Sequence, residues 1–256
     1  MRFRRRRLLA FLLLLGAYPG LSYANDTVTV AVASNFATTA TAIAAAFTEA
    51  SDITVRLSPG STGKLYAQIL NGAPYDVFLA ADVERPRLLE QQGQIIRGSR
   101  KTYATGSLVL WSRDERLRGR NCHDALIQGD YRRLALANPT TSPYGAAARE
   151  FLVAEKLWET VSPRAVYGEN IAHSMQFVAT GNAGMGFIAK AQTKLARLPA
   201  ATCSWPVPET LHSPLRQQAV ILKRAEGNRG AQAFLEFLAS EAARRLIRDD
   251  GYRVSD

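Results

Sequence analysis

Short apolar runs rich in β-branched residues alternate with longer Ala-rich stretches along most of this chain. Such alternation is typical of parallel strands joined by crossover helices. The strands predicted in the first half are 28–32, 53–57 and 76–80, and the helices that follow them are 37–50, 62–71 and 83–92. A second series has strands in SLVLWS, RLALA, RAVYG and MGFIA, with helices over 146–157 and 172–181. A last strand, 218–222, precedes two closing helices, 228–240 and 241–249.

The order of these elements predicts an α/β fold with two lobes, each a mostly parallel sheet flanked by helices. The two series are similar in size, and we expect the chain to cross between them near Gly106 and again near 215–217. Lobe 1 would then contain residues 25–106 and 217–256, and lobe 2 residues 107–216. Ligands of open α/β sheets bind outside the carboxyl ends of the strands, so the expected binding site is a cleft between the lobes.

The first 24 residues have the features of a secretory signal peptide. A run of arginines is followed by LLAFLLLLGAYPGL and then by Ser22-Tyr23-Ala24, where small residues favour cleavage after Ala24. The apolar run is shorter than the roughly 20 residues that a membrane span requires. The segment has no cysteine for lipid attachment, so we expect a soluble protein in the periplasm.

Removal of this segment changes the charge of the chain. The full sequence has 32 basic and 22 acidic residues; five of the basic residues and none of the acidic ones lie in 1–24, which leaves a net charge of +5. The remaining cations are spread along polar helix faces, as at Arg244, Arg245 and Arg248, without interleaved aromatics. This distribution argues against a nucleic-acid-binding surface, although a mild positive field attracts anions.

Cys122 and Cys203 are the only cysteines of the sequence. An exported chain meets an oxidising compartment, so we predict that they form a disulfide. A metal site or a catalytic thiol is less favoured, because His123, His173 and His212 lack ligand spacing to either cysteine. We expect no cofactor and no directly coordinated metal.

Three predicted strand-to-helix junctions carry small, uncharged residues: Ser34-Asn35, Ser61-Thr62-Gly63 and Pro143-Tyr144-Gly145. The free N–H groups of a helix N-terminus bind anions without help from Lys or Arg. A tetrahedral oxyanion offers only acceptors, so its site must supply donors. The junctions therefore predict anion binding, and helix capping is the alternative interpretation for Ser34-Asn35.

The second junction also resembles two catalytic motifs. A phosphate loop is excluded because Ser58 and Leu65 occupy positions that require Gly and Ser or Thr. Ser61 and Lys64 have the S-x-x-K spacing of Ser-Lys acyl enzymes, but the companion S-D-N and K-T-G motifs are absent from the sequence. We do not expect an enzyme, and an exported Ser-Lys hydrolase stays as the less favoured alternative.

Six segments carry a family resemblance across essentially the whole predicted mature chain: AVASNFATT, SPGSTGKLYAQILNGAPYDVFLAAD, GSRKTYATGSLVLWS, LALANPTTSPYGAAA, GENIAHSMQFVATGNAGMGFIA and AFLEFLAS. In this order they resemble the periplasmic molybdate- and tungstate-binding proteins of ABC importers, which have the type II periplasmic-binding fold. The second segment is the most specific, because its Gly-Ser-Thr-Gly turn, its helix ending in Gly-Ala-Pro and its strand DVFLAAD occur together.

The resemblance implies which residues bind the oxyanion. The first-strand donors of the family fall on Ser34 and Asn35, the second-junction serine falls on Ser61, and backbone N–H donors fall on Tyr144 and Ile171. It also implies capture of molybdate or tungstate through the oxygens, delivery to a permease in the inner membrane, and a monomeric protein. A receptor for sulfate or phosphate is the alternative, although phosphate would require an acceptor carboxylate, and none occupies the donor positions.

One position departs from the family pattern. Many members have a tyrosine whose hydroxyl contacts the anion where this chain has Ala189. The chain therefore resembles the subgroup that lacks this tyrosine and has Tyr144 in another loop. Whether the side chain of Tyr144 or only its backbone contacts the ligand stays open at this point.

Overall fold

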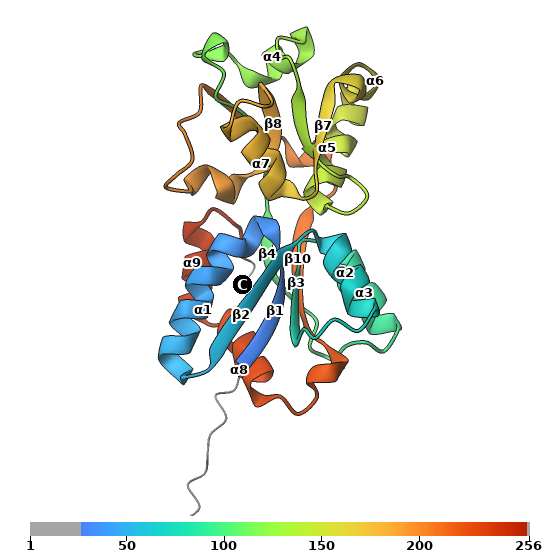
Figure 1. Ribbon diagram of the computed structural model, residues 1–256, viewed down its shortest axis with the longest axis vertical. Coiled ribbons are helices and arrows are strands. Elements are labelled where there is room, and N and C mark those ends of the chain that lie inside the picture. Colours follow the sequence, from blue (N-terminus) through green and yellow to red (C-terminus); the bar gives the residue numbers. More distant parts are fainter. Residues whose placement is uncertain (1–26, 255–256) are drawn as a thin grey trace, which may run out of the picture.

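A computed structural model describes residues 27–254, so the predicted signal peptide lies outside the described residues. The described residues form two lobes, which lie one above the other in Figure 1, and each lobe contains a five-stranded sheet. Within this part of the chain, no helix is both long enough and apolar enough to cross a membrane.

Lobe 1 is built on a sheet with strand order β2-β1-β3-β10-β4. Its strands are β1 (Thr27–Ala33), β2 (Thr54–Gly60), β3 (Val77–Ala80), β4 (Lys101–Gly106) and β10 (Leu215–Ile221). One face packs against α1 (Ala37–Ser51), α8 (Arg229–Leu238) and α9 (Glu241–Asp249), and the other against α2 (Thr62–Leu70) and α3 (Glu84–Gln91). Side chains alternate between the faces of a strand, so Val30 and Val32 pack under α1 while Ala31 packs under α2.

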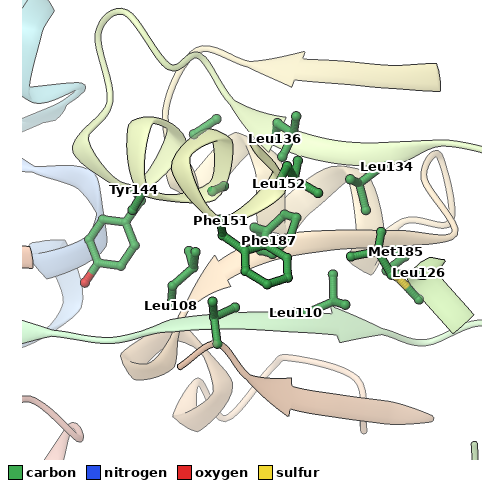
Figure 2. Packing of buried hydrophobic residues seen from close by; sticks show 14 of the residues in the cluster. Leu108, Leu110, Leu126, Leu134, Leu136, Tyr144, Phe151, Leu152, Met185 and Phe187 are labelled. Atoms are coloured by element: carbon green, nitrogen blue, oxygen red, sulfur yellow. The ribbon is translucent and has the colours of Figure 1, made fainter. Parts of the chain in front are cut away.

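Lobe 2 has strand order β7-β6-β8-β5-β9. Its strands are β5 (Leu108–Ser112), β6 (Leu134–Ala137), β7 (Ala165–Gly168), β8 (Met185–Ala189) and β9 (Cys203–Pro206), and its helices are α4 (Cys122–Gln128), α5 (Pro143–Ala154), α6 (Trp158–Val161) and α7 (Ile171–Ala179). On one face, Leu108 and Phe187 pack against Phe151 of α5 (Figure 2). On the other face, Val109 and Ile188 pack against Val178 of α7.

Short 3-10 helices occur at several connections. They are η1 (Ser34–Phe36), η2 (Glu115–Leu117), η3 (Ser162–Arg164), η4 (Lys190–Lys194), η5 (Glu209–Leu211) and η6 (Lys223–Ala225). The first of them matters for the site, because η1 joins the carboxyl end of β1 directly to α1.

One strand in each sheet runs against the other four. β5 is antiparallel to β8 and β9, and β10 is antiparallel to β3 and β4. Both strands carry the chain into their lobe from the cleft: β4 ends at Gly106 and β5 begins at Leu108, while β10 enters lobe 1 at Leu215. The parallel strands end at the cleft, so a strand that starts there must run the opposite way. The helix starts that follow them therefore meet between the lobes.

The predicted disulfide is confirmed. Cys122, the first residue of α4, is bonded to Cys203, the first residue of β9, and the two are separated by 81 residues in sequence. Closure of a loop of this length stabilises the folded state by roughly 4.5 kcal/mol in the chain-entropy model. The bond holds α4 on the edge strand of lobe 2, far from the cleft.

Most predicted elements are present, with three kinds of difference. The helix expected over 146–157 begins at Pro143, because proline favours the first helical position and Ser142 caps the helix. Strands β4 and β9 were not predicted: β4 (KTYATG) is half polar, and β9 (CSWP) has only four residues and ends in proline. Helices α4 and α6 were also not predicted, and they have only seven and four residues.

Candidate anion-binding site

A small cavity lies between the lobes, where the three predicted junctions meet a fourth, the start of α7 at Ile171. Its lining residues come from the ends of β1, β2 and β3 and from the starts of α2, α5 and α7: Ala33, Ser34, Asn35, Gly60, Ser61, Thr62, Ala81, Ser142, Pro143, Tyr144 and Ile171. About 160 Å³ among these residues is not occupied by protein atoms, and part of this space is open to solvent. The structure thus brings together all five residues expected at the site, and none of the lining residues is charged.

The first junction is held by side-chain bonds of Asn35 that do not cap a helix. Neither η1 nor α1 has a side-chain cap, so the capping interpretation of Ser34-Asn35 is wrong. Asn35 is 5% exposed, and its amide donates to Gln217 Oε1 at 3.0 Å and to Tyr252 Oη at 3.2 Å. The Tyr252 hydroxyl in turn donates to the Asn35 carbonyl at 2.7 Å. These bonds fix the backbone of the junction beside the cavity.

The second junction contacts lobe 2 directly. Ser61 occupies the N-cap position of α2, yet its hydroxyl makes no capping bond and donates to the Thr141 carbonyl at 2.6 Å. The Gly63 N–H donates to the same carbonyl at 2.8 Å. A Cβ atom at Gly63 would lie only 3.0 Å from both Cα and O of Thr141, so the close approach requires glycine. The first turn of α2 is therefore packed against the loop that precedes α5.

Two ion pairs and one hydrogen bond also join the lobes. Lys64 Nζ lies 3.1 Å from Glu169 Oε1, and Arg85 donates to the Thr140 carbonyl at 3.1 Å. On the other side, Arg253 pairs with Glu209 at 2.6 Å. These contacts hold the two lobes against each other.

The third and fourth junctions leave one N–H group each facing no protein acceptor. In α5, Pro143 has no N–H and the Ser142 hydroxyl accepts from Gly145 N at 3.4 Å. In α7, the Asn170 side chain accepts from the N–H groups of Ala172 and His173. These caps leave the N–H groups of Tyr144 and Ile171, for which the described residues provide no acceptor. Both residues line the cavity, where an anion would satisfy them.

The Tyr144 side chain lies at the crossing between the lobes. It is 1% exposed, and its hydroxyl points away from the apolar cluster of lobe 2 (Figure 2). The hydroxyl accepts from Gln217 Nε2 at 3.3 Å and lies so near Gly106 that a Cβ atom there would be 2.0 Å away. Burial raises the pKa of Tyr144 well above its ordinary value, so the hydroxyl stays neutral. The residue is therefore placed to offer the cavity its backbone N–H, while its hydroxyl lies at the crossing between the lobes.

Ala189, where many family members have tyrosine, is fully buried in the apolar cluster that contains Tyr144. Its N–H donates to Gln192 Oε1 at 2.9 Å, and Ala189 is not among the residues that line the cavity. The structure therefore shows no hydroxyl from this strand end at the site.

Several residues that shape the site were missed from the sequence. Thr141 supplies the carbonyl that bridges the lobes, and Gln217, Tyr103 and Tyr252 hold the first and third junctions. The paired glutamines in the apolar strand sequence LRQQAVI were a signal for buried polar contacts, but their partners are too distant in sequence to be identified from the pattern.

The Ser-Lys pair lacks the geometry of a nucleophile and its base. The hydroxyl of Ser61 donates to Thr141, and the ammonium group of Lys64 is paired with Glu169. Activation of serine requires a hydrogen bond to the base, which neither group makes here. Over residues 27–254, no group of three or more His, Cys, Asp or Glu side chains is arranged to hold a metal ion.

Comparison with known proteins gives matches over nearly the whole chain. A family model described as bacterial extracellular solute-binding protein matches residues 28–253. The chain is 41% identical over 226 residues to the molybdate-binding protein ModA of Rhodobacter capsulatus, covering 88% of this chain and 87% of that protein. It is 42% identical over 230 residues to ModA of Azotobacter vinelandii, covering 88% and 89%.

A solved structure matches the two-lobed architecture as a whole. The periplasmic molybdate-binding protein of Azotobacter vinelandii superposes with a TM-score of 0.84 and 35% sequence identity, covering 90% of this chain and all of that one. The predicted fold class, a two-lobed α/β fold of the type II periplasmic-binding proteins, is confirmed.

Proposed function

Because the chain belongs to the family of bacterial extracellular solute-binding proteins, we propose that it captures molybdate between its lobes and delivers it to an ABC importer. Members of this family are binding components of transport systems, so the protein is not an enzyme. Tungstate is the second ligand of the proposal, because it has the same charge and tetrahedral shape.

The observation that carries the proposal is a cavity between the lobes that is lined only by uncharged residues, most of them from four junctions, two in each lobe. Molybdate is a dianion with four acceptor oxygens and no proton to donate at neutral pH. Helix N-termini supply N–H donors and a positive dipole end without a titrating group. Each hydrogen bond to a charged oxygen contributes about 1.5–3 kcal/mol, so a handful suffices for tight binding.

The same lining argues against phosphate. Phosphate keeps a proton near neutral pH, and a site that distinguishes it from a fully deprotonated dianion needs a buried acceptor. The cavity has no Asp or Glu side chain, and the Thr141 carbonyl already accepts from Ser61 and Gly63. Sulfate carries no proton, so discrimination against it depends on size: donors fixed for longer metal–oxygen bonds hold a smaller tetrahedron poorly.

Closure of the lobes is the proposed route to tight binding. Ser34, Asn35 and Ser61 belong to lobe 1, whereas Tyr144 and Ile171 belong to lobe 2, so an open form cannot present all donors to one anion. An anion that contacts both sides favours the closed form by its differential affinity for the two states. The bonds from Ser61 and Gly63 to Thr141 complete that closed form.

The proposal also covers location and partners. The Azotobacter vinelandii structure that this chain resembles is named a periplasmic protein, and we propose the same compartment here, reached through the signal peptide over residues 1–24. We propose that the protein acts as a monomer, docks on a permease in the inner membrane, and binds molybdate through its oxygens without a resident cofactor.

A thermal-unfolding panel tests this function. A ligand present at 100 times its Kd stabilises the folded state by about 2.7 kcal/mol, which corresponds to a rise in Tm of roughly 5–10 °C for a protein of this size. We expect such a rise with molybdate and with tungstate, and none with sulfate or phosphate at the same concentration. A larger rise with sulfate or phosphate than with molybdate would overturn the proposal.

A further inference from the structure

Gln217 is a fully buried polar side chain beside the cavity that contacts residues from both lobes. It lies on β10, two residues after the chain enters lobe 1, and its exposed fraction is 0%. Its Oε1 atom accepts from Asn35 Nδ2 and from the Tyr103 hydroxyl, each at 3.0 Å. Its Nε2 atom donates to the Tyr144 hydroxyl at 3.3 Å. One amide group thus joins the first junction to the third.

The surrounding bonds define which way this amide points. The Tyr252 hydroxyl donates to the Asn35 carbonyl and accepts from Asn35 Nδ2, so the amide nitrogen of Asn35 is the end that faces Gln217. A reversed Gln217 would place two NH₂ groups against each other in a buried site, where an unsatisfied donor is costly. The side chain therefore has one favourable orientation.

The backbone is shaped to admit this side chain. The register between β10 and β4 shifts between Gln217 and Gln218, and a bulge of this kind redirects a side chain. Gly106, at the end of β4, leaves the required space, because a Cβ atom there would lie 2.8 Å from Gln217 Nε2 and 2.0 Å from the Tyr144 hydroxyl. The bulge and the glycine together make room for the contact between Gln217 and Tyr144.

We propose that Gln217 is a positioning residue that sets the distance between the anion donors of lobe 1 and lobe 2, and thereby the size of oxyanion that the closed cavity selects. The inference rests on the proposed function. Gln217 is not among the residues that line the cavity. It acts through Asn35 and Tyr144, which line the cavity from opposite lobes.

The variant Gln217→Met tests this role, because methionine has a similar length and no hydrogen-bonding amide. Two of its three partners keep other support: the hydroxyl proton of Tyr103 has a second acceptor in the Ala80 carbonyl at 3.2 Å, and Asn35 keeps its bonds to Tyr252. The protein should therefore fold. Gln218→Met is the matched control, because Gln218 is the next residue, is buried, and is hydrogen-bonded to Arg100 and Thr102 away from the cavity.

The measurement is the Kd for sodium molybdate and for sodium sulfate, by calorimetry with competition where binding is weak. We expect Gln217→Met to lose roughly tenfold in molybdate affinity, equivalent to the loss of one hydrogen bond, with a smaller loss for sulfate. The preference for molybdate over sulfate should fall, while Gln218→Met keeps the wild-type ratio. A merely structural role would lower Tm without changing this ratio.

A second variant tests the proposal independently of that ratio. In Gln217→Glu, a protonated carboxyl can replace the amide as donor to Tyr144, whereas the ionised form cannot and also repels a dianion. Burial raises the pKa of such a carboxyl toward neutrality. We expect the molybdate affinity of this variant to fall as the pH rises from about 6 to 9 while that of the wild type stays constant.

The possible results distinguish failure of the proposed function from failure of the positioning role of Gln217. If wild-type protein binds no molybdate, the proposed function fails and this inference with it. If wild type and Gln218→Met bind molybdate and Gln217→Met has the wild-type ratio of affinities, the positioning role is overturned while the proposed function stands. A pH-independent affinity in Gln217→Glu would overturn it as well.

Discussion

The Ser61 hydroxyl donates a hydrogen bond of 2.6 Å to the Thr141 carbonyl, across the boundary between the two lobes. A hydroxyl has a single proton, so while this bond is made the Ser61 side chain cannot also donate to an anion. We therefore predict that the Ser61 side chain supports binding by joining the lobes, and a direct bond from its hydroxyl to the anion is the alternative.

This geometry predicts the size of a mutational effect. Ser61→Ala removes a bond to a neutral carbonyl, so we expect molybdate affinity to fall by about 0.5–1.5 kcal/mol, or roughly two- to twelvefold. A hydroxyl bonded to the dianion would contribute about 1.5–3 kcal/mol instead. Calorimetry on the variant distinguishes a hydroxyl bonded to Thr141 from one bonded to the anion. A loss of roughly a hundredfold in molybdate affinity would assign the hydroxyl to the anion, and an unchanged affinity would show that the hydroxyl has no role at the site.

Gly63 gives a prediction in which stability and affinity move in opposite directions. Alanine is better than glycine within a helix by about 0.5–1 kcal/mol, so Gly63→Ala should keep or raise the Tm of the ligand-free protein. Its Cβ would meet backbone atoms of Thr141 at 3.0 Å, so the closed form is strained and molybdate should bind more weakly.

The control for this prediction is Gly184→Ala in lobe 2, where the nearest atoms to a new Cβ lie at 3.6 Å. We expect that variant to bind molybdate as the wild type does. Equal affinities for Gly63→Ala and Gly184→Ala, measured by calorimetry, would show that close approach of α2 to Thr141 is not needed for binding.

The pair between Lys64 and Glu169 predicts a small, salt-dependent effect. Both side chains are about half exposed, and pairs of this kind contribute up to about 1 kcal/mol. Lys64→Ala should weaken molybdate binding by no more than this, and the difference from wild type should shrink at high ionic strength. Lys223→Ala is the matched control, because Lys223 pairs with Glu226 within lobe 1. Loss of all binding in Lys64→Ala would contradict the role assigned to this lysine.

Three buried tyrosines predict how stability depends on pH. Burial raises the pKa values of Tyr103, Tyr144 and Tyr252 in the folded protein, whereas in the unfolded chain they ionise near pH 10. The unfolded state therefore loses these protons first, so their contribution is complete below about pH 10 and is lost as the pH rises further. Urea midpoints measured from pH 8 upward should stay level until about pH 10 and then fall. Ultraviolet detection of tyrosinate at all three positions in the folded protein below that pH would contradict this expectation.

The fold was largely predictable because its sheets have simple patterns. In β1, Val30 and Val32 face one set of helices and Ala31 faces the other, and runs of this kind identify strands buried on both faces. β4 has no such run, because its outer residues Lys101 and Thr102 are exposed. Its position in the sheet depends on pairing with β10, more than 100 residues later.

The candidate site was predictable only in part, for a related reason. Ser34, Asn35 and Ser61 carry polar side chains directly after strands, so their position is visible in the sequence. Ile171 provides only a backbone N–H, which its residue type does not reveal, and it was identified by family resemblance. The contact from Asn35 to Gln217 spans 182 positions, so no local pattern reports it.

Calorimetric titration of the ligand-free protein with molybdate tests the central claim most directly. We predict one molybdate per chain, with a Kd in the micromolar to nanomolar range. The affinity should not change between about pH 6 and 9, because Tyr144 is the one titratable residue among those that line the cavity and burial raises its pKa, so it stays neutral. Sulfate and phosphate should bind much more weakly in the same buffer. Tighter binding of sulfate or phosphate than of molybdate would contradict the account.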